Sequence, residues 1–178
     1  SALWRMPAEG GTPQRVTLGT GPEAQPSLAA SGRMAFSTAV DRFDIALVDL
    51  RTGQRTRLGG ARSESGPGFS PDGSAIVFTS DREVSFDLWV QPLVAAVPSG
   101  RARRLTDQPG NESLPAWSPD GRWIAYANVD GGERDLWVIP ARGGLAVRLT
   151  SRPGPDVHPS WSPDGGGAGF RVGPRGRG

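Results

Sequence analysis

The sequence predicts an all-β fold, a β-propeller built from four-stranded antiparallel blades. Three observations predict it: a seven-residue motif recurs, the same order of short apolar runs follows each copy, and the copies are evenly spaced. The motif reads PGFSPDG at 67–73, PAWSPDG at 115–121 and PSWSPDG at 159–165, with a weaker copy, PSLAASG, at 26–32. A period of about 40 to 50 residues is typical of solenoids and propellers.

The copies at 26–32, 67–73 and 115–121 are each followed by three runs that have the character of strands. The first run directly follows the motif, the second begins at an aspartate after a charged loop, and the third closes the unit. All are rich in β-branched or aromatic residues and are bounded by Gly, Pro, Asp or Ser. The first runs are 33–37, 74–80 and 122–128, the second begin at Asp44, Asp87 and Asp135, and the third are 54–59, 101–106 and 146–150.

The two ends of the sequence extend this pattern as partial units. Residues 3–17 align without gaps on 136–150, so the chain opens with the last two strands of one unit and ends early in another. We therefore expect one propeller over residues 1–170 and a disordered, Gly/Arg-rich tail over 171–178. The propeller divides into a partial blade (2–18), three repeats (26–59, 67–106 and 115–150) and a second partial blade (159–170).

The Ser-Pro-Asp-Gly end of the motif predicts a turn between the first two strands of a unit. Proline fixes φ near the value that a type I turn needs, aspartate tolerates the next position, and glycine takes the positive φ that follows. A sheet with large side chains on both faces cannot bury itself, so the units should stack radially. The side chains expected to fill the contacts between units are Leu28, Phe69, Trp117 and Trp161.

The composition excludes several classes of protein. The 178 residues include no cysteine, so neither a disulfide framework nor a thiolate metal site is expected. No apolar run approaches the length of a membrane span and the N-terminus lacks the layout of a signal peptide, so we expect no membrane insertion. All 20 basic residues are Arg, scattered among 18 acidic ones, without the basic stripe that nucleic-acid-binding proteins show.

The sequence offers no convincing catalytic or cofactor site. His158 is the only histidine, and no Gly-x-Ser-x-Gly nucleophile elbow occurs. Asp156 and His158 together are too few ligands for a metal site. Asp72, Asp120 and Asp164 are explained by the turns that contain them. We therefore predict a non-catalytic protein without a cofactor.

The loops after the second strand of each unit, and those between units, should emerge on one face. They carry charges of both signs with Asn and His, which suits a protein or peptide partner. Self-association through open blade edges is a further expectation. The candidate partner-binding residues are Asp41, Arg42, Asp81, Arg82, Glu83, Asp107, Asn111, Glu112, Asp130, Glu133, Arg134, Arg152, Asp156 and His158.

These motifs resemble the TolB-like β-propeller repeat, which runs from Pro-Ser-Trp-Ser-Pro-Asp-Gly through an Ile-Ala-Phe/Tyr strand and an Asp-Leu-Trp-Val strand to Gly-Gly and Arg-Leu-Thr. The resemblance covers residues 2–165 and is most specific over 115–165. It weakens over 26–60, where Ala30 and Ser31 replace the Pro and Asp of the turn. Propellers of this family usually have six blades. Either the chain is a piece of a larger propeller, or its partial units pair and close a four-bladed ring.

The resemblance implies a scaffold for protein–protein interaction or sensing in a bacterial envelope or multidomain protein. It favours a periplasmic or other extracytoplasmic location. An alternative that it leaves open is the substrate-gating propeller of a prolyl oligopeptidase-type serine peptidase, whose catalytic domain is absent from this chain.

Overall fold

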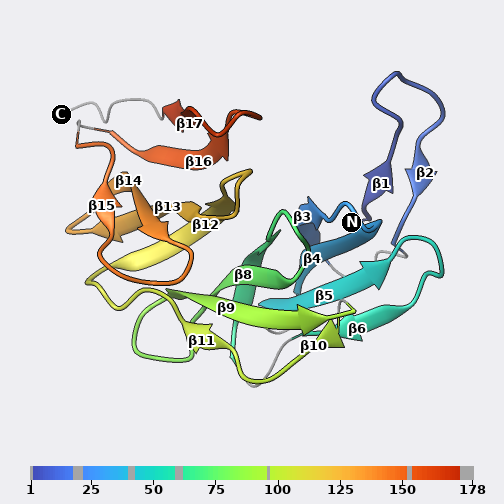
Figure 1. The fold of residues 1–178 in the computed structure, drawn as a ribbon, viewed down its shortest axis with the longest axis horizontal. Coiled ribbons are helices and arrows are strands. Elements are labelled where there is room, and N and C mark those ends of the chain that lie inside the picture. The colour runs from blue at the N-terminus through green and yellow to red at the C-terminus, as the bar shows by residue number, and fades with distance from the viewer. Residues whose placement is uncertain are drawn as a thin grey trace.

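The computed structural model describes residues 2–17, 22–39, 43–58, 62–95, 97–151 and 154–172. Within these ranges the fold is all-β, as predicted, and no helix is long and apolar enough to cross a membrane. Three complete antiparallel sheets form an arc, with a strand pair at each end (Figure 1).

Each complete sheet has its strands in chain order, and the three sheets are here called repeats 1, 2 and 3. Repeat 1 is β3-β4-β5-β6, repeat 2 is β7-β8-β9-β11 with the short β10 also on β9, and repeat 3 is β12-β13-β14-β15. The bounds are β3 Glu23–Leu28, β4 Arg33–Ala39, β5 Phe43–Asp49, β6 Arg55–Arg57, β7 Glu64–Phe69, β8 Ala75–Ser80, β9 Asp87–Val94, β10 Val97–Pro98, β11 Arg103–Arg104, β12 Asn111–Trp117, β13 Trp123–Asp130, β14 Glu133–Pro140 and β15 Val147–Arg148.

The two partial units do not pair with each other. Among the described residues, β1 (Trp4–Arg5) pairs only with β2 (Gln14–Arg15), and β16 (Asp156–Trp161) pairs only with β17 (Ala168–Val172). Figure 1 shows these pairs, here called the N-terminal and C-terminal half-blades, at opposite ends of the arc. The four-bladed ring is therefore not closed, and the fold is an open arc of a propeller.

The recurring turn has one hydrogen-bonding scheme. In the turn after β12, the Ser118 hydroxyl donates to Asp120 Oδ1 at 2.6 Å and accepts from the Trp123 backbone N–H at 2.9 Å. Asp120 also accepts from the Arg122 backbone N–H, and Gly121 has a φ of 71°. These contacts hold the pKa of Asp120 down to about 2, the Ser118 hydroxyl being the main cause. The same Ser–Asp contact recurs in Ser70–Asp72 and Ser162–Asp164.

The core lies between neighbouring sheets, as radial stacking requires. Leu88 and Leu105 of repeat 2 pack with Ile124 and Tyr126 of repeat 3 in one buried cluster. The predicted aromatic contacts are also present, because the Trp117 indole N–H donates to the Gly68 carbonyl of the preceding repeat. Equivalent contacts are made by Trp161 with the Ala116 carbonyl and by Phe69 with the core of repeat 1.

Leu28 is the exception among the residues expected to lie between units. Its side chain is 66 % exposed, because no first strand of a preceding unit lies against it among the residues that the structure describes. Phe69, at the same position in repeat 2, is only 8 % exposed. The exposure of Leu28 therefore results from the missing neighbour and not from a different role in its own sheet.

Each first strand begins three or four residues ahead of the proline at which its unit was placed and contains a β-bulge. The register shifts in β12 between Ser113 and Ala116, and the same irregularity occurs in β3, β7 and β16. The residue before the proline has a left-handed φ in every case: 53° at Gln25, 61° at Gly66, 55° at Leu114 and 57° at His158. Such angles are uncommon for residues other than glycine, and residues before proline favour extended angles.

Candidate functional site

The face predicted to bind a partner is built by two sets of connections. Residues 81–86 join β8 to β9, Gly131 and Gly132 join β13 to β14, and residues 105–110 lead into β12. Three candidates, Asp41, Arg42 and Arg152, lie outside the described residues. The others fall into two groups, those used inside the molecule and those left on its surface.

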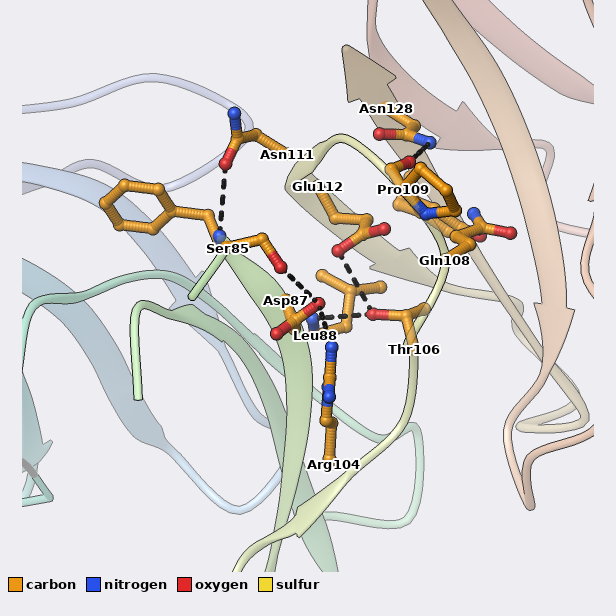
Figure 2. A network of polar contacts seen from close by, with 12 residues as sticks. Ser85, Asp87, Leu88, Arg104, Thr106, Gln108, Pro109, Asn111, Glu112 and Asn128 are labelled. Carbon is orange, nitrogen blue, oxygen red and sulfur yellow. Dashed lines mark hydrogen bonds and ion pairs between the residues drawn. The ribbon is translucent and has the colours of Figure 1, made fainter. Parts of the chain in front are cut away.

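A polar network beneath this face ties repeat 2 to repeat 3 (Figure 2). Thr106 accepts a hydrogen bond from the Leu88 backbone N–H at 2.9 Å and donates to Glu112 Oε2 at 3.2 Å. Asn111 Oδ1 accepts from the Phe86 backbone N–H at 3.1 Å, and the Phe86 carbonyl accepts from the Glu112 N–H at 2.8 Å. The predicted placement of Asn111 and Glu112 in a loop is therefore wrong: both lie on β12 and join it to the preceding repeat.

Asp87 is the second acid of this network. It is fully buried at the start of β9. Arg104 of β11 donates a hydrogen bond to its carboxylate at 2.9 Å, and the Ser85 hydroxyl donates a second one at 3.2 Å. Figure 2 shows Asp87 and Glu112 on neighbouring strands at the centre of the network. An acid on the third strand and an arginine on the fourth form the same pair in the other repeats, Asp44–Arg57 and Asp135–Arg148.

Glu112 has an unusual protonation equilibrium. Burial is the main cause that raises its pKa to about 8, and the negative charge of Asp87 adds to the effect, while the Thr106 hydrogen bond opposes it. Glu112 Oε1 and Asp87 Oδ2 are both buried without a hydrogen bond from any described donor. A proton on Glu112 reduces the repulsion between two buried acids, so the folded protein holds this carboxyl neutral at pH 7.

Replacing Glu112 by glutamine should remove a pH dependence of stability. The folded state binds the Glu112 proton more tightly than the unfolded state, whose pKa is near 4.5. The free energy of unfolding of the wild type should therefore fall as the pH rises from about 4.5 to about 8 and then level off. A rise of the pKa from 4.5 to about 8 corresponds to about 5 kcal/mol. We therefore expect Glu112→Gln to be more stable than the wild type at pH 9 by several kcal/mol, with about 5 kcal/mol as the upper bound, and nearly equal to it at pH 4.

Urea denaturation of both proteins between pH 4 and pH 9 measures this difference. Taking the difference between the two proteins cancels the titration of groups that they share. A difference that does not change with pH would show that Glu112 titrates normally.

Arg82 also serves the fold. It forms an ion pair with the buried carboxylate of Glu64, and its guanidinium lies 5.2 Å from the centre of the Phe78 ring and 5.1 Å from that of Trp89. Cation–π contacts of this kind stabilise a side chain in one place. A charge reversal at Arg82 would therefore disturb repeat 2 itself, and it is unsuitable as a test of partner binding.

Asp156 and His158 lie on β16 and not in the predicted loop. The strand starts earlier than expected because its bulge accommodates an additional residue before the proline. Asp156 is fully buried, whereas His158 is exposed. Of this pair, only His158 is accessible to a partner.

The remaining candidates form a mixed-charge surface. Asp81 is half-buried in the loop before β9 and accepts a hydrogen bond from the Ser63 backbone N–H at 2.8 Å. Arg134 is half-buried and forms no ion pair with any described residue. The exposed candidates with acidic side chains are Glu83, Asp107, Asp130 and Glu133.

A cleft that sequence reasoning missed contains one of the candidates, His158. The first strands β3, β7, β12 and β16 each lie at the edge of their sheet and contact one another along the arc. At their bulges they enclose a groove of about 420 Å³, here called the inner cleft. Its lining is the residue pair at each bulge: Gln25–Pro26, Gly66–Pro67, Leu114–Pro115 and His158–Pro159.

No metal centre is indicated within the described ranges. No group of three or more His, Cys, Asp or Glu side chains there is placed to hold an ion. The inner cleft brings together one imidazole, one amide and one aliphatic side chain, from His158, Gln25 and Leu114. This set can hydrogen-bond and make apolar contacts, which suits a peptide or a protein surface better than a metal.

The buried acids could have been found from the sequence by one signal. An acid follows the closing threonine of a unit by six residues in Thr17–Glu23, Thr106–Glu112 and Thr150–Asp156. The structure gives the reason in two of these cases, because the Thr17 and Thr106 hydroxyls donate to Glu23 and Glu112. The threonine hydroxyl also accepts a hydrogen bond from a backbone N–H at the third strand, as Thr106 does from Leu88. It thus connects the third strand of one unit to the first strand of the next.

Four-stranded sheets that stack through their first strands and pack their faces together define a β-propeller domain. The description of the matching family model is "TolB beta propeller domain", and it matches residues 88–177. An uncharacterized protein of Agrobacterium fabrum is 32 % identical over 110 residues, which are 60 % of this chain and 36 % of that protein.

Two solved structures agree with this match. TolB from Acinetobacter baumannii superposes with a TM-score of 0.79 at 27 % identity, over 92 % of this chain and 41 % of that one. A putative TolB from Agrobacterium tumefaciens superposes with a TM-score of 0.83 at 26 % identity, over 97 % of this chain and 66 % of that one. The chain belongs to the TolB β-propeller family. It spans about a third of its curated relative and less than half of the Acinetobacter protein.

Proposed function

We propose that this chain is a non-catalytic interaction module that binds a peptide or protein partner through the inner cleft. The observation that carries the proposal is the backbone at the cleft. Gln25, Leu114 and His158 hold left-handed φ angles although glycine, which takes such angles without strain, occupies the equivalent Gly66. Strained positions that line a cleft are a recognised feature of ligand sites.

The chemistry of the cleft favours binding through side chains. A proline at each bulge removes a backbone N–H from the free edge of the first strand. Prolines on an edge oppose the addition of a further strand. A partner should therefore contact the His158, Leu114 and Gln25 side chains and not extend the sheet.

The charges on the predicted face suit the recognition of a protein surface. Asp107, Asp130, Glu133 and Arg134 occupy the ends of the strands and loops on the predicted face. Mixed charges at a rim contribute specificity and association rate more than affinity. We propose a role in a bacterial envelope or multidomain protein, in an extracytoplasmic compartment, and family membership is the support for that location.

Variants of the cleft provide the test of binding. Peptides enriched from a random-peptide phage library on the immobilised chain would be measured by calorimetry against wild type and a Leu114→Gly/His158→Gly double variant. We expect the double variant to bind at least about tenfold more weakly, since buried apolar and aromatic contacts dominate such sites. Glycine relieves the left-handed strain at both positions, so the variant should not lose stability.

The matched control is Arg142→Ala. Arg142 lines a separate groove with Asp120 and Trp123, at the turn end of repeat 3. Its replacement should leave peptide affinity unchanged. Equal binding by wild type and the double variant, or enrichment of no peptide at all, would overturn the proposal.

A further inference from the structure

The end of the sheets that carries the recurring turns is rich in arginine. Neighbouring strands are antiparallel, so the connections between the third and fourth strands lie at this same end, here called the turn end. Its aspartates in the three repeats, Asp49, Asp72 and Asp120, accept hydrogen bonds inside their own turns. The exposed arginines of the turn end in these repeats are Arg51, Arg55, Arg101, Arg103, Arg122 and Arg142.

One part of the turn end is hollowed. A groove of about 500 Å³ lies in repeat 3 and is here called the turn groove. Its lining comes from the recurring turn after β12 and from the connection after β14, and consists of Asp120, Gly121, Arg122, Trp123, Pro140 and Arg142. Sites for small ligands are hollows of this size, lined by apolar or aromatic side chains with a few polar groups.

Trp123 is the one aromatic side chain of the turn groove. It is 38 % exposed and belongs to none of the described buried clusters between the sheets. The register of the second and third strands places Ala75, paired with Pro92, at this position in repeat 2, and Arg33, paired with Asp49, in repeat 1. An aromatic ring is therefore not needed here to build a blade, and an exposed tryptophan is typical of a binding surface.

The turn groove carries an excess of positive charge. Asp120 is the only acid of its lining, and Arg122 pairs with it at 2.6 Å, so these two charges cancel. Arg142 is exposed, and its side chain forms no hydrogen bond or ion pair with any residue that the structure describes. The Arg142 guanidinium is therefore available to an anion.

A further guanidinium lies beside the groove and comes from the preceding repeat. Arg103 of β11 donates to the carbonyl of Ala141, the residue before Arg142. A side-chain carbon placed at Gly143 would lie 3.7 Å from Arg103 Nη1. The Ala141 N–H donates to the Arg122 carbonyl at 2.8 Å, which fixes this connection against the recurring turn. Two arginines from neighbouring repeats thus flank one short segment.

We propose that the turn groove binds an acidic sugar, such as a uronic acid unit of an anionic polysaccharide. The C–H face of a pyranose ring packs on a flat indole, here that of Trp123. Arginine binds a carboxylate through two parallel hydrogen bonds, here from Arg142. An acidic peptide would use the arginines but has no need of a ring surface at Trp123. The turn groove shares no lining residue with the inner cleft, so the two sites are separate.

Calorimetry with trigalacturonic acid at low salt tests the proposal. Its trimethyl ester has the same rings without the charges, and we expect the acid to bind at least about tenfold more tightly than the ester. Trp123→Ala and Arg142→Ala should each weaken binding of the acid at least about fivefold. Neither side chain belongs to a described buried cluster, so both variants should keep the circular dichroism spectrum and the urea midpoint of the wild type.

Two control variants separate the groove from the general charge of the turn end. Arg101→Ala removes the same charge from this end outside the groove and should leave binding unchanged. Trp123→Phe keeps a ring and should retain most of the affinity. If Trp123→Ala fails to fold, Arg142→Ala compared with Arg101→Ala still decides.

Three results would overturn the proposal. They are no binding of trigalacturonic acid, equal weakening by Arg101→Ala and Arg142→Ala, and equally tight binding of hexaglutamate, which would show an acidic-peptide site instead. Peptide affinity at the inner cleft should be the same in wild type and Trp123→Ala. The two proposals can therefore fail independently of each other.

Discussion

Replacing Arg104 by alanine is expected to lower the free energy of unfolding by about 2 to 3 kcal/mol. Arg104 is the only described cation that bonds to Asp87, whose carboxylate is fully buried. Removing one partner of a buried ion pair costs about 3 to 5 kcal/mol, because the other charge stays in a poorly solvated place. We expect less than this, because 34 % of the Arg104 side chain is exposed. Urea denaturation measures the loss.

The Arg122→Ala variant is the matched control. Arg122 also pairs with an aspartate, Asp120, at 2.6 Å, but both side chains are well exposed. Asp120 would keep its hydrogen bonds from the Ser118 hydroxyl and the backbone N–H of residue 122. Exposed pairs contribute little, so the denaturation midpoint should stay near that of wild type. Equal losses of unfolding free energy in the two variants would mean that the burial of Asp87 adds nothing to the cost of removing its cation.

Replacing Leu105 by alanine should be at least as damaging, with a loss of about 2 to 4 kcal/mol. Leu105 packs with Leu88, Ile124 and Tyr126 in the cluster that joins repeat 2 to repeat 3. Its removal leaves a cavity between two rigid sheets, which cannot close in to fill it. The free energy of unfolding from urea titrations of a dilute sample measures the effect.

Leu149→Ala, the same change one unit later, should cost much less in dilute solution. Leu149 is about half exposed, because no third strand covers it within the described part of the chain. Losses of equal size for Leu105→Ala and Leu149→Ala in the monomer would contradict the open end of the arc.

Much of the fold could be predicted from the sequence, because its signals are local and repeated. The Ser-Pro-Asp-Gly motif sets a turn through contacts within six residues, such as Ser118 with Asp120 and Trp123. The order of strands follows from the apolar runs, and the glycine pairs at 131–132 and 143–144 take the positive φ values of hairpin turns. Four repetitions of one pattern make each assignment more secure than any single one.

The candidate site was less predictable, because it depends on contacts between units. Glu112 and Asp156 are acidic residues between two apolar runs, which is typical of an exposed loop, yet both are buried against a neighbouring repeat. The bulges shift the start of every first strand, and no local signal predicts a left-handed φ at Leu114 before a proline. The inner cleft becomes visible only when four such bulges lie side by side.

Nuclear magnetic resonance of this chain with an enriched peptide tests the central claim, binding at the inner cleft, most directly. The backbone amide shifts should change at the four bulges, around Gln25, Gly66, Leu114 and His158. The recurring turns at the opposite ends of the strands should be unaffected. Shift changes confined to those turns, or to the outer strands β6, β11 and β15, would contradict partner binding at the inner cleft.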